Sequence, residues 1–341
     1  MLSFSDKLKM DRLCDRFKRN FRITELFAIY LERFPDIINK NIISELCGDG
    51  SIAAADALPA LLGEIFGLET DANPEDRILM RDYIIPSVRL LDADKYMSNP
   101  YYKNVKLPDV KSGDWEFKNE VYPAYRGVIC DDIQFFEDFK EIPPLGFFTT
   151  DFHFPAVLEN GNEWMTLTPV DLDTCENAIN AAHGKVVTFG LGLGYYAYMV
   201  SIKNNVESIT VVEKSERVIE LFKKYILPQF PYPEKVRIIN ADAFEYAESM
   251  GSECYDLAFV DTWRDASDGA PMYQKMKRLE KKSPSTEFLY WIENFIISRL
   301  RAERFVEIRE AYRSGNLNTD YDTVVKRLTD IDFLISEITD I

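Results

Sequence analysis

The segment that decides the fold is VVTFGLGLGYYAYMVS, residues 186–201, in which an apolar run leads into three alternating glycines and then a helical stretch. Gly190, Gly192 and Gly194 allow the backbone to turn sharply and to approach a ligand without Cβ clashes. The start of the following helix favours anionic groups. A tight strand-to-helix turn without a ligand produces the same pattern, so the segment predicts a ligand site only together with its neighbours.

Acidic residues end or follow three later runs of strand type. Glu213 ends SITVVE nineteen residues after Gly194, Asp242 follows KVRIIN and precedes Ala243, and Asp261 ends YDLAFVD. Ligands of open parallel sheets bind at the carboxyl ends of the strands, so we expect these residues to converge. Glu213 could then accept hydrogen bonds from ribose hydroxyls. Asp242 could accept one from an adenine amino group that has apolar neighbours beside its ring.

From Lys185 onward, short β-rich runs alternate with helical stretches, which predicts βαβ units and a parallel sheet. The fold class expected is therefore α/β, with a Rossmann-like sheet, an N-terminal helical domain and C-terminal helices. Residues 288–293 (FLYWIE) are a candidate fifth strand, and helical patterns follow over residues 296–312 and 324–338. Partial alternation about the turn at residues 159–162 predicts a β-hairpin ahead of the sheet.

The chain divides into three predicted regions: a helical domain over residues 1–95, an irregular connecting region over 96–145, and the hairpin plus Rossmann-like domain over 146–341. Helical spacing marks the first region, in Met10, Leu13, Cys14, Phe17 and Phe21. Ser51 is an expected helix cap, as is Asn73 before a proline. The N-terminal helices could cap a substrate site or form the contact of a homodimer.

Composition excludes several classes of function. The formal net charge of −17 opposes binding to phosphate polymers, so DNA or RNA is not an expected partner. No apolar run reaches the roughly 20 residues of a membrane span, and the first residues lack a signal-peptide core, so a cytoplasmic protein is expected. Five cysteines without CxxC spacing and two histidines predict no metal site. Neither a GxSxG nor a GxxxxGK[ST] motif is present.

With these motifs in place, residues 146–293 closely resemble the class I S-adenosylmethionine-dependent methyltransferase superfamily, including its aminopropyltransferase branch typified by spermidine synthase. The runs EWMTLTP, FGLGLGY, VVEKSERVIELF and YWIE are similar to those of bacterial methyltransferase-like proteins. The resemblance implies S-adenosylmethionine as cofactor. It also implies a set of cofactor-binding residues: Gly190, Gly192, Gly194, Glu213, Asp242, Ala243 and Asp261. Tyr195, which follows the glycine loop, could form a wall beside the cofactor.

Three features depart from the family pattern. Thr188 stands two residues before the first glycine, where the family commonly has an acid that contacts the methionine amino group. The motif at Asp261 continues Thr-Trp-Arg, unlike the Asp-Pro-Pro-Tyr of amino-group methyltransferases. Little after residue 293 indicates the usual final β-hairpin, so the sheet is either truncated or completed from elsewhere in the chain.

Asp261, Trp263 and Asp265 are the catalytic candidates, because acids near the transfer point could bind a cationic amine and an indole could flank it by cation–π contact. A solvated acidic turn explains the same loop. Trp291 could line the same crevice, and Asp171 lies where a gate over the cofactor is expected. The two histidines, His153 and His183, are interpreted as structural.

The leading hypothesis is an enzyme, a methyltransferase that uses S-adenosylmethionine and acts on a small-molecule acceptor. Three alternatives stay open. The acidic loop also suits an aminopropyltransferase, and the pattern from Gly192 to Ala197 also suits a dinucleotide oxidoreductase. Because fold does not determine function, a non-catalytic nucleotide-binding protein is the third.

Overall fold

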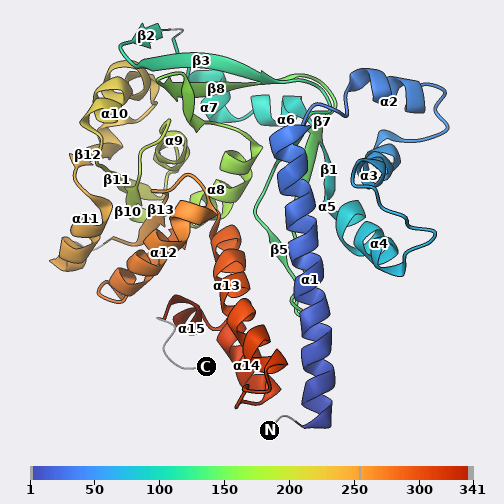
Figure 1. Cartoon of the computed structure of the whole chain (residues 1–341). Helices are drawn as coiled ribbons and strands as arrows, with labels where there is room; N and C mark the ends of the chain where they lie inside the picture. Colours follow the sequence, from blue (N-terminus) through green and yellow to red (C-terminus); the bar gives the residue numbers. More distant parts are fainter. Residues whose placement is uncertain (1–2, 109, 253–254, 337–341) are drawn as a thin grey trace. The chain divides into compact units, whose positions relative to one another are not determined.

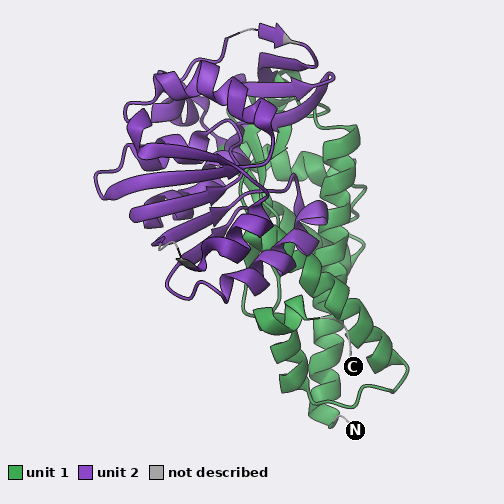
Figure 2. Cartoon of the chain, turned by 90° about the vertical axis from the view of Figure 1, so that its left-hand side faces the viewer, with its two compact units in different colours: residues 1–90, 125–147, 293–341 green, residues 91–124, 148–292 purple. Residues whose placement is uncertain are grey.

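The computed structural model describes residues 3–108, 110–252 and 255–336, and these form two compact units (Figures 1 and 2). Unit 1 combines residues 1–90, 125–147 and 293–341, and unit 2 combines residues 91–124 and 148–292. The predicted domains followed chain order, whereas each observed unit is assembled from separate segments. The C-terminal helices, predicted as part of the domain over residues 146–341, group with the N-terminal helices in unit 1.

Unit 1 is mainly helical. Its helices are α1 (Phe4–Arg33), α2 (Lys40–Cys47), α3 (Ala54–Ile65), α4 (Pro74–Leu79), α5 (Ile85–Ser87), α13 (Glu293–Arg313), α14 (Tyr321–Thr329) and α15 (Ile331–Ile335). A three-stranded sheet of order β1-β7-β4 belongs largely to this unit, with β1 (Val88–Leu91), β7 (Leu145–Phe148) and β4 (Gly127–Ile129). A short ladder joins β5 (Gln134–Phe135) to β6 (Glu141–Ile142).

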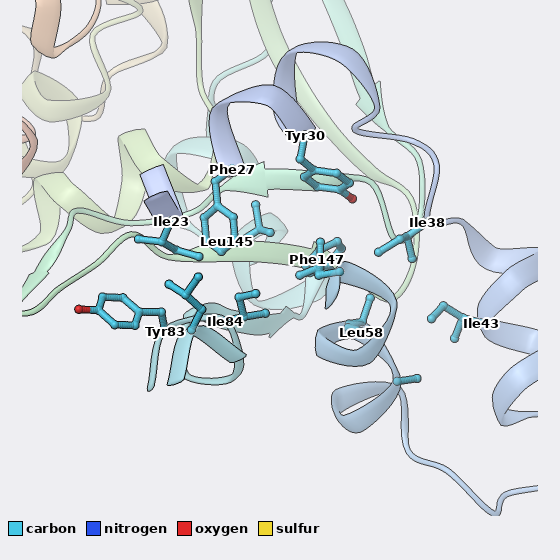
Figure 3. Packing of buried hydrophobic residues seen from close by; sticks show 13 residues of the cluster. Ile23, Phe27, Tyr30, Ile38, Ile43, Leu58, Tyr83, Ile84, Leu145 and Phe147 are labelled. Carbon is cyan, nitrogen blue, oxygen red and sulfur yellow. The ribbon is translucent and has the colours of Figure 1, made fainter. Parts of the chain in front are cut away.

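The core of unit 1 forms where one face of α1 meets the segments that follow it. Ile23, Phe27 and Tyr30 of α1 are buried there, and Figure 3 shows them beside Leu145 and Phe147 of β7. A second cluster joins the first half of α1 to the C-terminal helices, including a stacked pair, Phe17 and Phe305, whose ring centroids are 3.8 Å apart. The helical period predicted from the N-terminal sequence therefore corresponds to a single long helix with one buried face.

Unit 2 contains the five-stranded parallel sheet, of order β12-β11-β10-β13-β14. Its strands are β10 (Gly184–Phe189), β11 (Val206–Glu213), β12 (Val236–Asn240), β13 (Leu257–Val260) and β14 (Glu287–Tyr290). The helices between and beside them are α8 (Pro169–Ala181), α9 (Tyr195–Ser201), α10 (Glu216–Leu221), α11 (Ala243–Ser249) and α12 (Ala266–Glu280). The order 3-2-1-4-5 along the chain is doubly wound, so the predicted Rossmann-like α/β fold is confirmed.

The central strands of this sheet are buried on both faces, which explains their apolar sequences. All four residues of β13 are fully buried, as are Val186 and Val187 of β10. The chain order reverses between β10 and β13, so a crevice opens where the connections from these two strands lead away in opposite directions. The glycine loop, residues 190–194, and Asp261 both lie at this switch point.

A four-stranded antiparallel sheet of order β2-β3-β8-β9 also belongs to unit 2, with β2 (Val110–Ser112), β3 (Trp115–Tyr122), β8 (Phe152–Glu159) and β9 (Asn162–Thr166). The predicted hairpin is confirmed as the β8–β9 pair. Describing residues 96–145 as irregular was wrong, because this region supplies β3 and the helices α6 (Ala93–Met97, partly) and α7 (Pro100–Asn104). Charged residues in the middle of β3 interrupt the alternation of apolar and polar side chains that marks a strand. The strand forms because its backbone pairs with β8.

Two further predictions are corrected. Ser51 does not cap the third helix: Ala53 occupies the N-cap position, without a side-chain bond, and the Ser51 hydroxyl donates to Asp49. The candidate strand at residues 288–293 ends at Tyr290, because Ile292 has φ +46° and Glu293 begins α13. No helix in the described ranges is both long and apolar enough to cross a membrane. No further strand joins the parallel sheet within the described residues.

Candidate functional site

A small cavity of about 40 Å³ lies at the carboxyl ends of β10 and β13, within unit 2. Three segments provide most of the wall: the glycine loop, the first turn of α9, and residues 165–167 with α8. The lining residues are Met165, Thr166, Leu167, Asp171, Cys175, Thr188, Gly190, Leu191, Gly192, Leu193, Tyr195, Tyr196, Ala197, Phe259, Asp261 and Trp291.

The three loop glycines occupy positions that other residues cannot adopt without strain, since all have positive φ. A Cβ at Gly190 would lie 1.8 Å from the backbone oxygen of Asp261, so the loop passes directly beside the end of β13. A Cβ at Gly192 would meet the terminal methyl of Met165 at 2.2 Å, which places the Met165 side chain over the loop inside the cavity. Close backbone approach therefore shapes the site.

Glu213 holds the glycine loop from the neighbouring strand. Its carboxylate accepts hydrogen bonds from the N–H of Leu191 at 3.2 Å and from the N–H of Ser215 at 2.7 Å. Ser215, and not Glu213, caps α10, because the Ser215 hydroxyl accepts a bond from the Val218 N–H. A carboxylate fixed in this way retains lone pairs for a ligand at the edge of the sheet.

Asp261 is the most perturbed acid of the cavity. It is partly buried, and its backbone N–H donates to Phe189 across the β10–β13 pair at 2.8 Å. Loss of hydration raises its pKa to about 8, and the negative charges of Asp171 and Glu213 act in the same direction. Without a ligand, this carboxyl group is therefore mostly protonated at neutral pH.

Asp171, on the first turn of α8, is a second acid in the wall. Its Oδ2 accepts bonds from the Thr168 N–H at 2.7 Å and the Thr168 hydroxyl at 2.9 Å. Burial raises its pKa to about 6, although the bonds from Thr168 act in the opposite direction. No Lys, Arg or His is among the lining residues, all of which lie in the described ranges. The cavity is consequently suited to a cationic ligand.

The structure separates the sequence candidates into two groups. Gly190, Gly192, Tyr195 and Asp261 line the cavity together with Trp291. The remaining cofactor candidates lie outside its lining. Gly194 is the first residue before α9, Glu213 contacts the loop from behind, Asp242 caps α11 through bonds from Phe244 and Glu245, and Ala243 is the buried first residue of that helix.

Two of the three catalytic candidates do not line the cavity. The Asp265 carboxylate caps α12, accepting the Ser267 N–H at 2.6 Å within a capping box that includes Asp268. Trp263 is buried with its ring parallel to Tyr290, at 6.4 Å between centroids, and its Nε1 has no hydrogen-bond partner among the described residues. For Asp265, the geometry thus favours the alternative in which this loop is a solvated acidic turn, with Asp265 as the cap of α12.

Two wall residues, Cys175 and Thr188, are not among the site residues predicted from the sequence. Cys175 contributes a thiol whose pKa burial raises well above its usual value. Thr188 is buried in the wall, and its hydroxyl donates to the Gly190 carbonyl at 3.4 Å, which gives this departure from the family pattern a role in the loop. The position of Cys175 on the buried face of α8 and of Thr188 near the end of β10 could have indicated these two residues. His153 and His183 are exposed and outside the cavity lining.

No group of three or more His, Cys, Asp or Glu side chains arranged to hold a metal ion occurs within the described residues.

No protein-family model and no curated protein sequence matches the chain. Solved structures do show similarity.

The spermidine synthase from Thermotoga maritima has 18% identity and a TM-score of 0.31, over 43% of this chain and 55% of that one. A spermidine synthase in complex with the transition state analogue AdoDATO has 18% identity and a TM-score of 0.30, over 43% and 54%. The precorrin 8W decarboxylase from Methanobacterium thermoautotrophicum has 17% identity and a TM-score of 0.27, over 34% and 60%. The chain thus spans between about half and three fifths of these proteins, a distant likeness of fold.

Proposed function

We propose that this chain binds S-adenosylmethionine in the cavity of unit 2 and acts as a methyltransferase on a small molecule. The observation that supports the proposal is the acidic wall beside the glycine loop, in which Asp171 and Asp261 face a cavity lined by no basic side chain. S-adenosylmethionine carries a sulfonium and an ammonium group, and opposite charges near these carboxyls favour their ionised form. The bound cofactor supplies an electrophilic methyl group.

In this proposal each acid at the sheet edge holds a different part of the cofactor. Glu213, oriented by the N–H groups of Leu191 and Ser215, accepts ribose hydroxyls. Asp242 and Ala243, at the start of α11 just after β12, form the adenine end. Tyr195 walls the site, and Asp261 faces the transferred group. Trp263 stays a candidate through its unpaired Nε1, whereas Asp265 serves to cap α12.

The same acidic wall argues against a dinucleotide. A pyrophosphate bound at the glycine loop would lie near Asp171 and Asp261, and like charges in a partly buried site repel. The glycine pattern shared with dehydrogenases therefore does not support an oxidoreductase in this chain. NAD is therefore the negative control for a binding experiment, since we expect it not to bind.

Aminopropyl transfer is the second candidate, and one observation favours it. The cavity lining contains no cation to pair with the carboxylate of S-adenosylmethionine. The decarboxylated form lacks that group and has a higher positive charge. If the acids dominate recognition, the decarboxylated form binds more tightly, and the reaction is aminopropyl transfer to an amine.

Titration calorimetry with S-adenosylmethionine, its demethylated product, decarboxylated S-adenosylmethionine and NAD tests these proposals together. We expect the sulfonium compounds to bind and NAD not to bind, and Asp261→Asn to weaken sulfonium binding roughly 10-fold or more. Asp265→Asn is the matched control, because asparagine also caps helices and the residue lies outside the cavity. Absence of binding by every sulfonium compound at millimolar concentration would exclude the proposed function.

Catalysis needs a separate test. The protein is incubated with a metabolite pool and a donor labelled in its methyl group, and labelled products are separated by mass. A labelled acceptor that is formed by the wild type and not by Asp261→Asn supports a methyltransferase. Binding without any labelled acceptor, and with no aminopropylated amine when the decarboxylated donor is supplied instead, would support the non-catalytic alternative.

A further inference from the structure

The short helix α7 and its cap residue Asn99 contact the glycine-loop side of the cavity. The Tyr101 hydroxyl donates to the Leu193 carbonyl at 2.5 Å, and Asn99 Nδ2 donates to the Tyr195 hydroxyl at 3.1 Å. The Tyr101 ring also packs edge-on against Tyr195, with centroids 5.7 Å apart. Leu193 and Tyr195 both line the cavity, so α7 holds this wall at a loop carbonyl and at a side chain.

The next residue of α7 contacts a second segment of the cavity wall. The Tyr102 hydroxyl donates to the Leu167 carbonyl at 2.5 Å, and Leu167 lies in the segment that leads into α8. The N–H of Leu167 donates to the Pro155 carbonyl of β8 at 3.1 Å, so the backbone around Leu167 is held from two sides. Four residues later, Asp171 contributes its carboxylate to the cavity.

We propose that α7 is a clamp that sets the separation of the two walls, with Tyr101 and Tyr102 as positioning residues for the ligand. Adjacent residues of this short helix each donate to a carbonyl of a different wall segment. Loop carbonyls and N–H groups outside regular ladders are otherwise free to move, and a preformed site avoids the cost of ordering them when the ligand binds. The inference rests on the proposed function for the identity of the ligand only.

Both tyrosines are buried, with 1% and 7% of their surface exposed, so their rings also contribute packing. The change that separates the clamp from the packing is tyrosine to phenylalanine, which keeps the ring and removes the hydroxyl. Loss of one buried hydrogen bond of this kind corresponds to roughly a 5- to 20-fold change in a local opening equilibrium.

Hydrogen exchange of the ligand-free protein is the primary test. Tyr101→Phe is expected to raise exchange of the amides of residues 190–195 about 10-fold and to leave residues 166–171 unchanged. Tyr102→Phe is expected to do the reverse. Tyr30→Phe is the control, since Tyr30 is a buried tyrosine of unit 1 that donates to the Pro35 carbonyl at 3.3 Å. A structural role alone would raise exchange generally and would not divide the two walls between the two variants.

Ligand affinity provides the second measurement. Each phenylalanine variant is expected to weaken binding of S-adenosylmethionine roughly 5- to 20-fold, and Asn99→Ala, which leaves both tyrosines in place, to weaken it less. If the wild type binds no sulfonium compound, the proposed function fails while the exchange result still decides the clamp. Exchange in Tyr101→Phe and Tyr102→Phe that equals the wild type over both walls overturns the clamp. If either variant does not fold, exchange of residues 190–195 in Asn99→Ala decides, with an unchanged rate counting against the clamp.

Discussion

At the scale of the residue, the Asp261 carboxyl group couples the cavity to the stability of the protein. Its pKa is raised from 3.8 to about 8, so between these values the folded protein binds more protons than the unfolded chain. The free energy of unfolding therefore decreases as the pH rises from about 4 to 8. Asp171, with a pKa raised to about 6, contributes in the same direction over the lower part of this window.

We predict that Asp261→Asn removes the upper part of this pH dependence. Relative to the wild type, the variant should gain roughly 1–3 kcal/mol of stability between pH 6 and pH 8, because asparagine cannot ionise. Urea unfolding at several pH values measures the difference. A wild type whose stability is constant or increasing across this range, after ligand removal, would contradict the assignment.

Ile292 is a second residue whose conformation has a measurable consequence. Its φ of +46° is unfavourable for a β-branched residue, and it connects the cavity residue Trp291 to the start of α13. Its side chain is buried, so any truncation loses packing. Glycine, however, tolerates positive φ and alanine does not.

We predict that Ile292→Gly is more stable than Ile292→Ala by about 1 kcal/mol, the reverse of the usual order at an ordinary backbone position. Thermal or denaturant unfolding of the two variants, compared with each other, gives the sign. Finding the alanine variant more stable would show that Ile292 carries no backbone strain.

At the scale of the element, the glycine loop differs in what lies opposite each glycine. A Cβ at Gly190 would collide with the backbone of Asp261, whereas one at Gly192 would meet the flexible end of Met165. Backbone at the end of a buried strand cannot move aside, but a methionine side chain can adopt another rotamer.

We predict that Gly190→Ala costs roughly 3–5 kcal/mol of stability and Gly192→Ala about 1–2 kcal/mol, the second mainly from its positive φ. Unfolding midpoints in urea rank the two. Equal costs would indicate that the loop moves away from β13 freely. Gly192→Ala combined with Met165→Ala should regain part of the loss if the collision with Met165 contributes to it.

The elements differ in how far they could be predicted. β10, β11 and β13 have apolar runs typical of a parallel sheet that is covered on both faces, so the sequence pattern sufficed for them. β3 and α7 lack such a pattern, because they are stabilised by pairing with β8 and by hydrogen bonds from tyrosine and asparagine side chains. The contacts that stabilise these two elements involve residues distant in the sequence, and a local sequence pattern does not record such contacts.

At the scale of the whole molecule, unit 1 is assembled from three separated segments, and a buried ion pair links two of them. Arg301 of α13 donates to Glu141 of β6 at 2.7 Å, and Ser298 donates to the same carboxylate. Both charged side chains are about nine-tenths buried. Breaking such a pair leaves an uncompensated charge in a dry environment.

We predict that Glu141→Gln lowers the free energy of unfolding of unit 1 by roughly 3–5 kcal/mol, whereas the double variant Glu141→Gln with Arg301→Met recovers most of this loss. A double-mutant cycle followed by denaturant unfolding provides the measurement. If the single variant is as stable as the double one, the buried charge is compensated elsewhere and the pair does not hold the segments together.

The sequence alone determined the parallel sheet, the glycine loop and the acids at the ends of successive strands, because short-range periodicity and steric limits on glycine act on neighbouring residues. Only the tertiary structure decided which acids share a cavity. Asp171 joins Asp261 there, while Asp265, closer in sequence, caps a helix. The physical reason is that burial and mutual repulsion, which set the protonation of these carboxyls, depend on what surrounds each group in space.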